Sequence, residues 1–364
     1  MDLAAMVAAG IAGKPATKEQ ALEILAAPDE QTLEIVAAAG KIRRHFFGNT
    51  MKLNYLVNLK SGLCPEDCNY CSQAMKSNAE ILRYNWLDEE QIDAAVRAGV
   101  ENGASTLCLV ASGRASSNRE VERVAGIVRK LHEEYPKVKI CTCLGFIDEK
   151  KAEVLIDAGS TRYNHNLNTA KSRYPEICTT HTFQDRVDTV KAISSAGMSP
   201  CTGMIAGMGE TDEQLVEIAF QLRELNADSI PVNFLLPFEG TPLESHRELT
   251  PQRCLKILAM MRFVNPDTEV RSAAGREYHI RTLQPLVFEI CNSIFLGDYL
   301  TSEGEAGAHD LRMLKDAGFV VVERGAEEQG EVCAGENETM VKIIDKAGIA
   351  IRHRGVGTNV PANA

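Results

Sequence analysis

The stretch DEKKAEVLIDAGSTRYNHNL, residues 148–167, holds one complete unit of the pattern that runs through most of this chain. An amphipathic helical segment ends at Gly159, a residue type that commonly terminates helices. A short strand candidate, TRYNHNL, follows at 161–167. The helical segments DEEQIDAAVRAGVENG and TDEQLVEIAFQLREL alternate with strand candidates in the same way. This alternation predicts parallel strands that are joined by helices.

Strand candidates of this kind recur eight times between residues 54 and 300. They are 54–59, 105–111, 138–145, 161–167, 199–207, 229–236, 268–274 and 293–300. Eight strands that alternate with helices over roughly 250 residues are typical of a (β/α)8 TIM-type barrel, and an open doubly wound sheet is the main alternative. We therefore expect an N-terminal helical segment at 1–50, a barrel at 51–320, and a C-terminal extension of unassigned role at 321–364, which carries Cys333.

The composition of the chain limits which binding partners and which cellular compartment we expect. The 364 residues include 39 Lys and Arg against 50 Asp and Glu, so a nucleic-acid partner, which needs a basic surface, is not expected. No apolar run reaches the ~18–20 residues of a membrane span, and the N-terminus lacks the basic region of a secretory signal. We expect a cytoplasmic protein with no membrane partner. Its eleven cysteines are then better interpreted as metal ligands or buried apolar groups than as disulfides.

Three cysteines, Cys64, Cys68 and Cys71, lie close together in SGLCPEDCNYCSQ, residues 61–73. They follow the first strand directly, at the mouth where such barrels carry their active sites. A structural zinc site closes all four of its positions, and no second tight cysteine pair lies nearby. Three thiolates can instead hold an iron–sulfur cube with one iron open to a substrate or cofactor. The alternative is a zinc-stabilised loop on a protein that is not an enzyme.

A second group of residues is spread over the strand candidates: Cys108, Cys141, Cys201 and Arg271. A lone cysteine in a strand is usually a small buried hydrophobe. An arginine inside a barrel is costly without a partner. If the four side chains point inward at similar depth, they converge near the barrel axis. Three thiolates opposite a guanidinium then indicate a second, anionic iron–sulfur cluster.

The C-x3-C-x2-C spacing, with Tyr70 before the last cysteine, resembles the signature of the radical S-adenosylmethionine (SAM) enzymes. From about residue 45 to 317 the order of the motifs resembles the biotin synthase family. These motifs are YNHNLNT (163–169), TTHTFQDRVDT (179–189), CTGMIAGMGET (201–211), IPVNFLLPFEGTPL (230–243), VRSAAGREYH (270–279) and NSIFLGDYLTSEG (292–304). Hydrogenase-maturation and methylornithine-type enzymes share the barrel and the first loop, and are the alternative within the same subgroup.

The resemblance implies a radical SAM sulfurtransferase that inserts sulfur into dethiobiotin to form biotin. It implies a [4Fe-4S] cluster that chelates SAM, and an auxiliary [2Fe-2S] cluster that supplies the sulfur. It also implies a flavodoxin- or ferredoxin-type reductant, iron–sulfur assembly proteins and a homodimer. By the same resemblance the residues divide into a SAM cluster (Cys64, Cys68, Cys71), an auxiliary cluster (Cys108, Cys141, Cys201, Arg271), SAM contacts (Tyr70, Asn166, Asn168, Arg186) and dethiobiotin contacts (Asn164, Asn233, Thr301, Ser302).

Period-two geometry places Asn164, Asn166 and Asn168 on one face of their strand, with His165 on the other. Asn168 stands where the family usually has an Asp that contacts the SAM ribose, so this contact is expected to lose its charge.

The third strand candidate reads CTC, so Cys143 shares a face with Cys141. The matching family position is often Thr. Cys143 is therefore either an extra ligand of an auxiliary cluster larger than [2Fe-2S], with Arg271 displaced, or a neighbour that binds nothing. Thr106 departs in the same region, where many relatives carry an Arg. We expect the remaining residues of interest to be structural: His132, His181 and His246 at the surface, and Cys178, Cys254 and Cys291 in packing.

Overall fold

The strands of the computed structural model, which describes residues 1–304, 307–322 and 324–325, close into a parallel barrel. Hydrogen bonding runs from β1 through β2, β3, β4, β5, β7 and β8 to β9, which pairs back with β1; β6 pairs with β7. In the closing pair, Lys52 lies opposite Ser293 and Tyr55 opposite Leu296. The closure confirms the predicted (β/α)8 TIM-type barrel and excludes the open sheet. The bounds are β1 (Thr50–Lys60), β2 (Thr106–Ala111), β3 (Lys139–Cys143), β4 (Arg162–Asn164), β5 (Ser199–Cys201), β6 (Met204–Ala206), β7 (Ser229–Phe234), β8 (Glu269–Ser272), β9 (Ser293–Leu296) and β10 (Val320–Val321).

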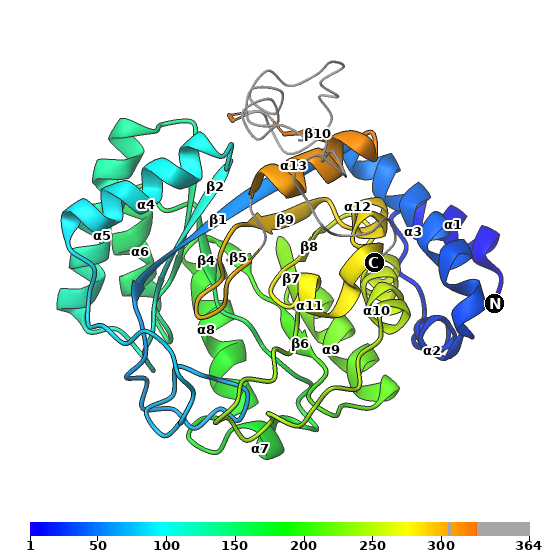
Figure 1. The fold of residues 1–364 in the computed structure, drawn as a ribbon, viewed down its shortest axis with the longest axis horizontal. Helices are drawn as coiled ribbons and strands as arrows, with labels where there is room; N and C mark the ends of the chain where they lie inside the picture. The colour runs from blue at the N-terminus through cyan, green and yellow to red at the C-terminus, as the bar shows by residue number, and fades with distance from the viewer. Residues whose placement is uncertain (305–306, 323, 326–364) are drawn as a thin grey trace, which may run out of the picture.

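Helices alternate with these strands and cover the outside of the barrel (Figure 1). Their bounds are α1 (Leu3–Ile11), α2 (Lys18–Ala26), η1 (Asp29–Gln31), α3 (Thr32–Phe47), α4 (Glu89–Glu101), α5 (Asn118–Glu134), α6 (Glu149–Asp157), α7 (Tyr174–Ile177), α8 (Phe183–Ser195), α9 (Asp212–Glu224), α10 (Pro251–Val264), α11 (Arg276–Ile280), η2 (Arg281–Leu283), α12 (Pro285–Ile290) and α13 (Gly307–Asp316). Several begin with a capping box. In this motif the side chain of the first residue accepts a hydrogen bond from the backbone N–H three residues later, and the side chain of that later residue accepts one from the backbone N–H of the first. Local sequence thus sets where these helices start.

The unit at 148–167 shows how local chemistry sets one repeat of the barrel. Asp148 begins α6 because its carboxylate accepts from the backbone N–H of Lys151 at 2.9 Å. Gly159 ends the helix with a φ of 106°, a conformation that costs a glycine little. The apolar face of α6, which includes Leu155, then packs onto the outer face of the strands. The chain turns directly into β4 and toward the barrel mouth.

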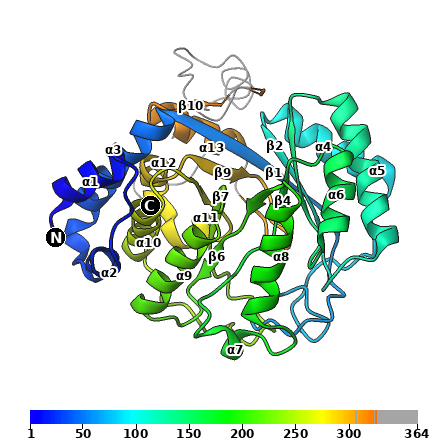
Figure 2. The same cartoon turned by 180° about the vertical axis from the view of Figure 1, so that it is seen from behind.

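The N-terminal helices pack against the barrel's own helices, as the blue segments beside α10 show in Figures 1 and 2. Ile24, Ile35 and Ile42 are fully buried and join one hydrophobic cluster with residues of α10. α10 lies between α2 and α3 on one side and the barrel on the other, so every residue from Cys254 to Val264 is buried. Burial of this apolar surface fixes the N-terminal segment to the barrel.

The fifth predicted strand, 199–207, is interrupted in the structure. Its residues form β5 and β6, separated by Thr202 and Gly203. A Cβ atom at Gly203 would lie 1.9 Å from the carbonyl oxygen of Pro231, so no other residue type fits there. The register against β7 is the same on both sides of the break. The break therefore changes the path of the chain without changing which strands pair.

The predicted extension at 321–364, with Cys333, lies almost wholly outside the described residues. Within the part of the chain that the structure describes, every helix is too short or too polar to span a bilayer.

Candidate active site

A cavity of about 350 Å³ opens at the C-terminal ends of the barrel strands. Side chains from the strand ends and from the loops after them form its wall. Of the residues predicted for the site, all but Cys201 line this cavity. Cys201 lies just behind the wall, where its Sγ is 3.3 Å from the Nδ2 of Asn164. One concave space therefore collects residues that lie more than two hundred positions apart in sequence.

The three-cysteine loop follows β1 and closes on itself at the mouth of the cavity. The backbone N–H of Cys71 donates to the carbonyl of Cys68 at 3.0 Å, and that of Cys64 donates to Gln73 at 3.2 Å. Burial raises the pKa of Cys64, and raises that of Cys71 to about 11. These thiols become thiolates at neutral pH only with a strong cationic partner, and a metal ion deprotonates a coordinating thiol outright. The donor set thus fits an iron–sulfur cluster.

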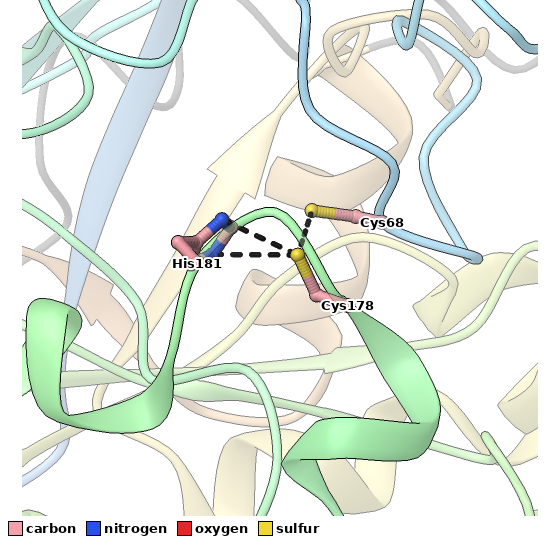
Figure 3. A group of neighbouring side chains, drawn as sticks. All are labelled: Cys68, Cys178 and His181. Atoms are coloured by element: carbon pink, nitrogen blue, oxygen red, sulfur yellow. Dashed lines mark hydrogen bonds between the residues drawn. The ribbon is translucent and has the colours of Figure 1, made fainter.

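Cys68 has two close neighbours that the sequence did not lead us to expect (Figure 3). The Sγ atoms of Cys68 and Cys178 lie 3.7 Å apart, and the Sγ of Cys178 lies 3.2 Å from Nδ1 of His181. All three side chains are buried, and their donor atoms lie close enough together to hold a metal ion. The expectation that His181 lies at the surface was wrong, because the loop after α7 packs against the cluster loop and buries this side chain. His132 is exposed as expected, whereas His246 is half-buried.

Acidic residues of the cluster loop hold this returning segment in place. Glu66 contacts Nδ1 of His181 at 2.6 Å and Nη1 of Arg114 at 2.9 Å. The carboxylate of Asp67 accepts from the backbone N–H groups of Thr179 and Thr180 at 3.0 and 3.2 Å. The hydrogen bonds outweigh burial and hold the pKa of Asp67 well below its usual range. The two loops are therefore tied together by ionised carboxylates.

The residues predicted to contact SAM lie next to this loop. The Nδ2 of Asn168 donates to the hydroxyl of Tyr70 at 2.6 Å, and Nη1 of Arg186 donates to the carbonyl of Asn166 at 2.8 Å. Nε of Arg186 donates to Nε2 of His181 at 3.1 Å. These hydrogen bonds hold the guanidinium of Arg186 at the wall of the cavity.

The period-two expectation for the fourth strand holds only in part. Asn164, Asn166 and Asn168 all line the cavity, but so does His165, which was predicted to face away. The strand ends at Asn164, and Asn168 has a left-handed backbone with a φ of 70°. Strict alternation of sides therefore stops four residues before Asn168.

The strand cysteines converge deeper in the barrel. Cys108 lies opposite Cys141 in the β2–β3 register, and Asn164 lies opposite Cys201 in the β4–β5 register. Nη1 of Arg271 lies 3.8 Å from the Sγ of Cys201. A hydrogen bond from Cys141, together with the charge of Arg271, lowers the pKa of Cys201 to about 5. The structure thus brings together the four side chains that the sequence singled out. The pKa values of Cys108 and Cys201 are lowered there, whereas the neighbouring cysteines and burial raise the pKa of Cys141.

Cys143 lies one inward-facing position nearer the mouth than Cys141. It is half-buried, and in register it lies opposite Val110 of β2. Burial raises the pKa of Cys143 to about 12. Tyr163 fixes the backbone just beyond it, since the tyrosine hydroxyl accepts from the N–H of Leu144 at 2.9 Å and donates to the carbonyl of Gly145 at 2.8 Å. Cys143 therefore faces the cavity from a fixed strand end.

The segment after β9 covers part of the cavity mouth. The hydroxyls of Thr301 and Ser72 lie 2.8 Å apart, so this segment meets the cluster loop directly. Ser302 accepts from the backbone N–H of Tyr299 at 2.9 Å through its carbonyl, which closes a tight turn. On the other wall, Asn233 donates from Nδ2 to the carbonyl of Met204 at 3.1 Å and accepts from the N–H of Ala274 at 3.2 Å. The side chain of Asn233 is thus held by β6 and by the segment that follows β8.

Of the remaining cysteines, Cys254 and Cys291 are buried in packing as expected. All ten cysteines in the described part of the chain are free thiols.

Comparison with known proteins agrees with this geometry. The radical SAM superfamily matches residues 59–222, and the biotin and thiamin synthesis associated domain matches residues 231–320. A biotin synthase from Cutibacterium acnes is 56% identical over 360 residues, which cover 99% of this chain and 100% of that protein. A biotin synthase from Streptomyces coelicolor is 56% identical over 343 residues, which cover 94% of this chain and 83% of that protein.

Solved structures agree on the fold at low identity. Methylornithine synthase superposes with a TM-score of 0.75 at 20% identity, covering 89% of this chain and 98% of that one. A maturase of the FeFe-hydrogenase from Carboxydothermus hydrogenoformans superposes with a TM-score of 0.74 at 18% identity, covering 88% of this chain and 79% of that one. These two structures share the barrel alone, whereas the curated relatives match nearly the full chain at more than half of its positions. The chain therefore belongs to the biotin synthase family, radical SAM enzymes that insert sulfur into dethiobiotin.

Proposed function

We propose that this chain carries out sulfur insertion inside the single cavity described above, with one sulfur-ligand set at its mouth and another at its floor. The proposal rests on the position of these two sets of cysteines around one cavity. Cys64, Cys68 and Cys71 would hold the [4Fe-4S] cluster at the mouth, and Cys108, Cys141, Cys201 and Arg271 would hold the auxiliary cluster at the floor. When bound, the first cluster with SAM supplies a 5′-deoxyadenosyl radical, and the second supplies the sulfur atom. A substrate between the two sets is within reach of both.

The chain's own residues would bind and orient the small molecules. Arg186, a buried cation beside the cluster loop, would pair with the SAM carboxylate, and Tyr70, Asn166 and Asn168 would contact the rest of SAM. For dethiobiotin, Asn164 and Asn233 offer amide groups that match a ureido ring, whereas Thr301 and Ser302 offer hydroxyls to its carboxylate.

The apolar part of the wall suits an alkyl substrate. Leu56, Ile205 and Phe295 line the cavity between these polar groups. An apolar wall also keeps water away from a carbon radical, which would otherwise meet competing reactions.

For the auxiliary cluster we propose [2Fe-2S] with Arg271 at the fourth position, and a larger cluster with Cys143 as a ligand is the second candidate. Cys143 favours the second candidate because it faces the same cavity one layer above Cys141. Iron and sulfide counts on a Cys143→Ser variant decide between the two. Lower counts than in the parent chain make Cys143 a ligand, and equal counts make it a neighbour.

Further proposals follow from the chemistry of the clusters. A low-potential electron donor of the flavodoxin or ferredoxin type would reduce the first cluster, and assembly proteins would rebuild the second. A cytoplasmic location suits the ten free thiols, and a homodimer is proposed from the family resemblance alone. The division into 1–50, 51–320 and 321–364 is likewise a proposal.

The experiment is an anaerobic reconstitution with iron and sulfide, followed by reduction in the presence of SAM and dethiobiotin. Mass spectrometry is expected to find biotin together with 5′-deoxyadenosine. A Cys201→Ala variant should still make 5′-deoxyadenosine but no biotin, because only the floor ligand set is broken. Cys254→Ala, a buried cysteine of α10 away from the cavity, is the matched control and should make both products. Deoxyadenosine without biotin from the parent chain would overturn the substrate assignment.

A further inference from the structure

A buried carboxylate lies beneath the auxiliary site, and the sulfur chemistry does not account for it. Glu269 on β8 is 6% exposed and contacts charged side chains from three strands. Its Oε2 accepts from Nζ of Lys52 at 3.1 Å and from Nη1 of Arg162 at 2.7 Å. Its Oε1 accepts from Nη2 of Arg271 at 2.6 Å and from the hydroxyl of Ser229 at 2.9 Å. One carboxylate thus joins β1, β4, β7 and β8 at one depth of the barrel.

This network is costly unless it serves a purpose beyond folding. Among the described residues, three cations and one anion of this network are each nearly fully buried, and removing charges from water costs several kcal/mol per ion. Replacing such a network by apolar residues is often neutral or stabilising. Stability alone therefore gives a weak reason for its presence. Among the described members of the network, Arg271 is the one that also lines the cavity. The network can therefore act on the site through its effect on Arg271.

The contacts of Arg271 leave one nitrogen for the cluster site. Nη2 is taken by Glu269 and Ser229, and Nε donates to the hydroxyl of Ser293 at 3.1 Å. Nη1 is the nitrogen that faces the Sγ of Cys201. Because the guanidinium is planar and rigid, fixing two of its nitrogens fixes the direction of the third. Among the described residues that hold Nη2 and Nε, Glu269 supplies the charged contact. Lys52 and Arg162 contact the other carboxylate oxygen of Glu269.

We propose that Glu269 is a positioning residue of the auxiliary site, which acts through Arg271 and orients its Nη1 toward the cluster. The proposal rests on the proposed placement of that cluster among Cys108, Cys141, Cys201 and Arg271. Lys52 and Arg162 are part of the device, because without them the carboxylate is free to turn. The same role applies whether Arg271 binds iron directly or donates a hydrogen bond to a cluster sulfur.

The test compares Glu269→Gln with Glu269→Asp in anaerobically reconstituted protein. Glutamine keeps the size and one acceptor but removes the charge that holds Arg271. We expect Glu269→Gln to lose iron and sulfide from the auxiliary site, or to change its Mössbauer and absorption spectra. The SAM cluster and SAM-dependent formation of 5′-deoxyadenosine should persist. Glu269→Asp keeps the charge and should retain more of the auxiliary signature than Gln.

Two further variants separate positioning from plain stability. Lys256→Met removes a buried lysine that pairs with the exposed Asp29, far from the cavity; it should lower the melting temperature and leave the auxiliary spectrum intact. In an Arg271→Met background, adding Glu269→Gln should change the auxiliary spectrum no further, because the residue acts through Arg271. If Glu269→Gln alone fails to fold, the double variant Glu269→Gln with Lys52→Met takes its place.

A Glu269→Gln protein with a lower melting temperature but the full parental auxiliary spectrum would overturn the proposal. The proposal would also be overturned if adding Glu269→Gln changed the auxiliary spectrum of the Arg271→Met variant as much as it changes that of the parent chain. These readouts do not depend on biotin formation. A parent chain that holds the auxiliary cluster but makes no biotin therefore contradicts the proposed function without deciding the role of Glu269.

Discussion

Replacing Arg186 by lysine should weaken SAM binding while leaving the SAM cluster in place. Arg186 is held by Asn166 and His181, and its Nη2 has no partner among the described residues. Burial alone would lower the pKa of Arg186, but the neighbouring Tyr70, Tyr174 and Cys68 raise it, so the guanidinium stays charged. Lysine keeps a charge but lacks the planar fork that pairs with a carboxylate through two parallel bonds.

The size of the effect follows from the bond that is lost. A hydrogen bond to a charged group contributes about 1.5–3 kcal/mol. Since about 1.4 kcal/mol corresponds to a factor of ten, the Kd for SAM should rise about 10- to 150-fold. The rate of SAM cleavage at saturating SAM should change much less, because the loss falls on binding. The change should therefore show in KM rather than in kcat.

Equilibrium dialysis of SAM against the reconstituted protein measures the Kd, and the SAM dependence of 5′-deoxyadenosine formation measures KM and kcat. Arg97→Lys, on the exposed face of α4, is the matched control and should bind SAM as the parent does. An Arg186→Lys protein whose Kd stays within about twofold of the parent would refute the pairing of this guanidinium with the SAM carboxylate.

Three further substitutions test other parts of the molecule. Tyr163→Phe leaves two backbone groups at the end of β3 without their partner, so urea titration should show a loss of about 1–3 kcal/mol in unfolding free energy. Asp310→Ala leaves the buried Arg276 without its bidentate partner and should cost about 3–5 kcal/mol by the same assay. Cys178→Val removes a sulfur atom 3.7 Å from the Sγ of Cys68, so an EPR-monitored redox titration should give a SAM-cluster potential that differs from the parental value, whereas Cys254→Val should give the parental value.

The fold could be predicted from the sequence because its signals are local. Many helices carry a side-chain cap of their own, and glycines such as Gly159 mark where they end. The interruption between β5 and β6 could not be predicted, because it depends on the carbonyl of Pro231, which approaches Gly203 from another strand. The strand β4 was predicted at 161–167, but its early end was not, for a related reason: the chain leaves the sheet after Asn164, although its residue pattern continues to alternate.

The residues of the site likewise fall into those that the local sequence predicts and those that depend on contacts between distant segments. Cys64, Cys68 and Cys71 lie within one loop, so their spacing alone marks them as ligands. Cys178 and His181 were interpreted as ordinary residues, because their meaning comes from a contact with Cys68 across more than a hundred positions. A signal was nonetheless present, since a cysteine and a histidine three residues apart can share one metal or one thiolate.

Glu269 is the instructive case, because local geometry was enough to find it. Two residues apart on one strand, Glu269 and Arg271 must share a face, just as Cys141 and Cys143 do. A buried arginine needs a partner, and a carboxylate two residues away on the same strand is in a position to be that partner. Lys52 and Arg162 could not be found in this way, since the β1–β9 and β4–β5 pairings that bring them to the same depth depend on closure of the whole barrel. The mouth of the site is thus encoded locally, whereas the charges that orient its floor exist only once the barrel has closed.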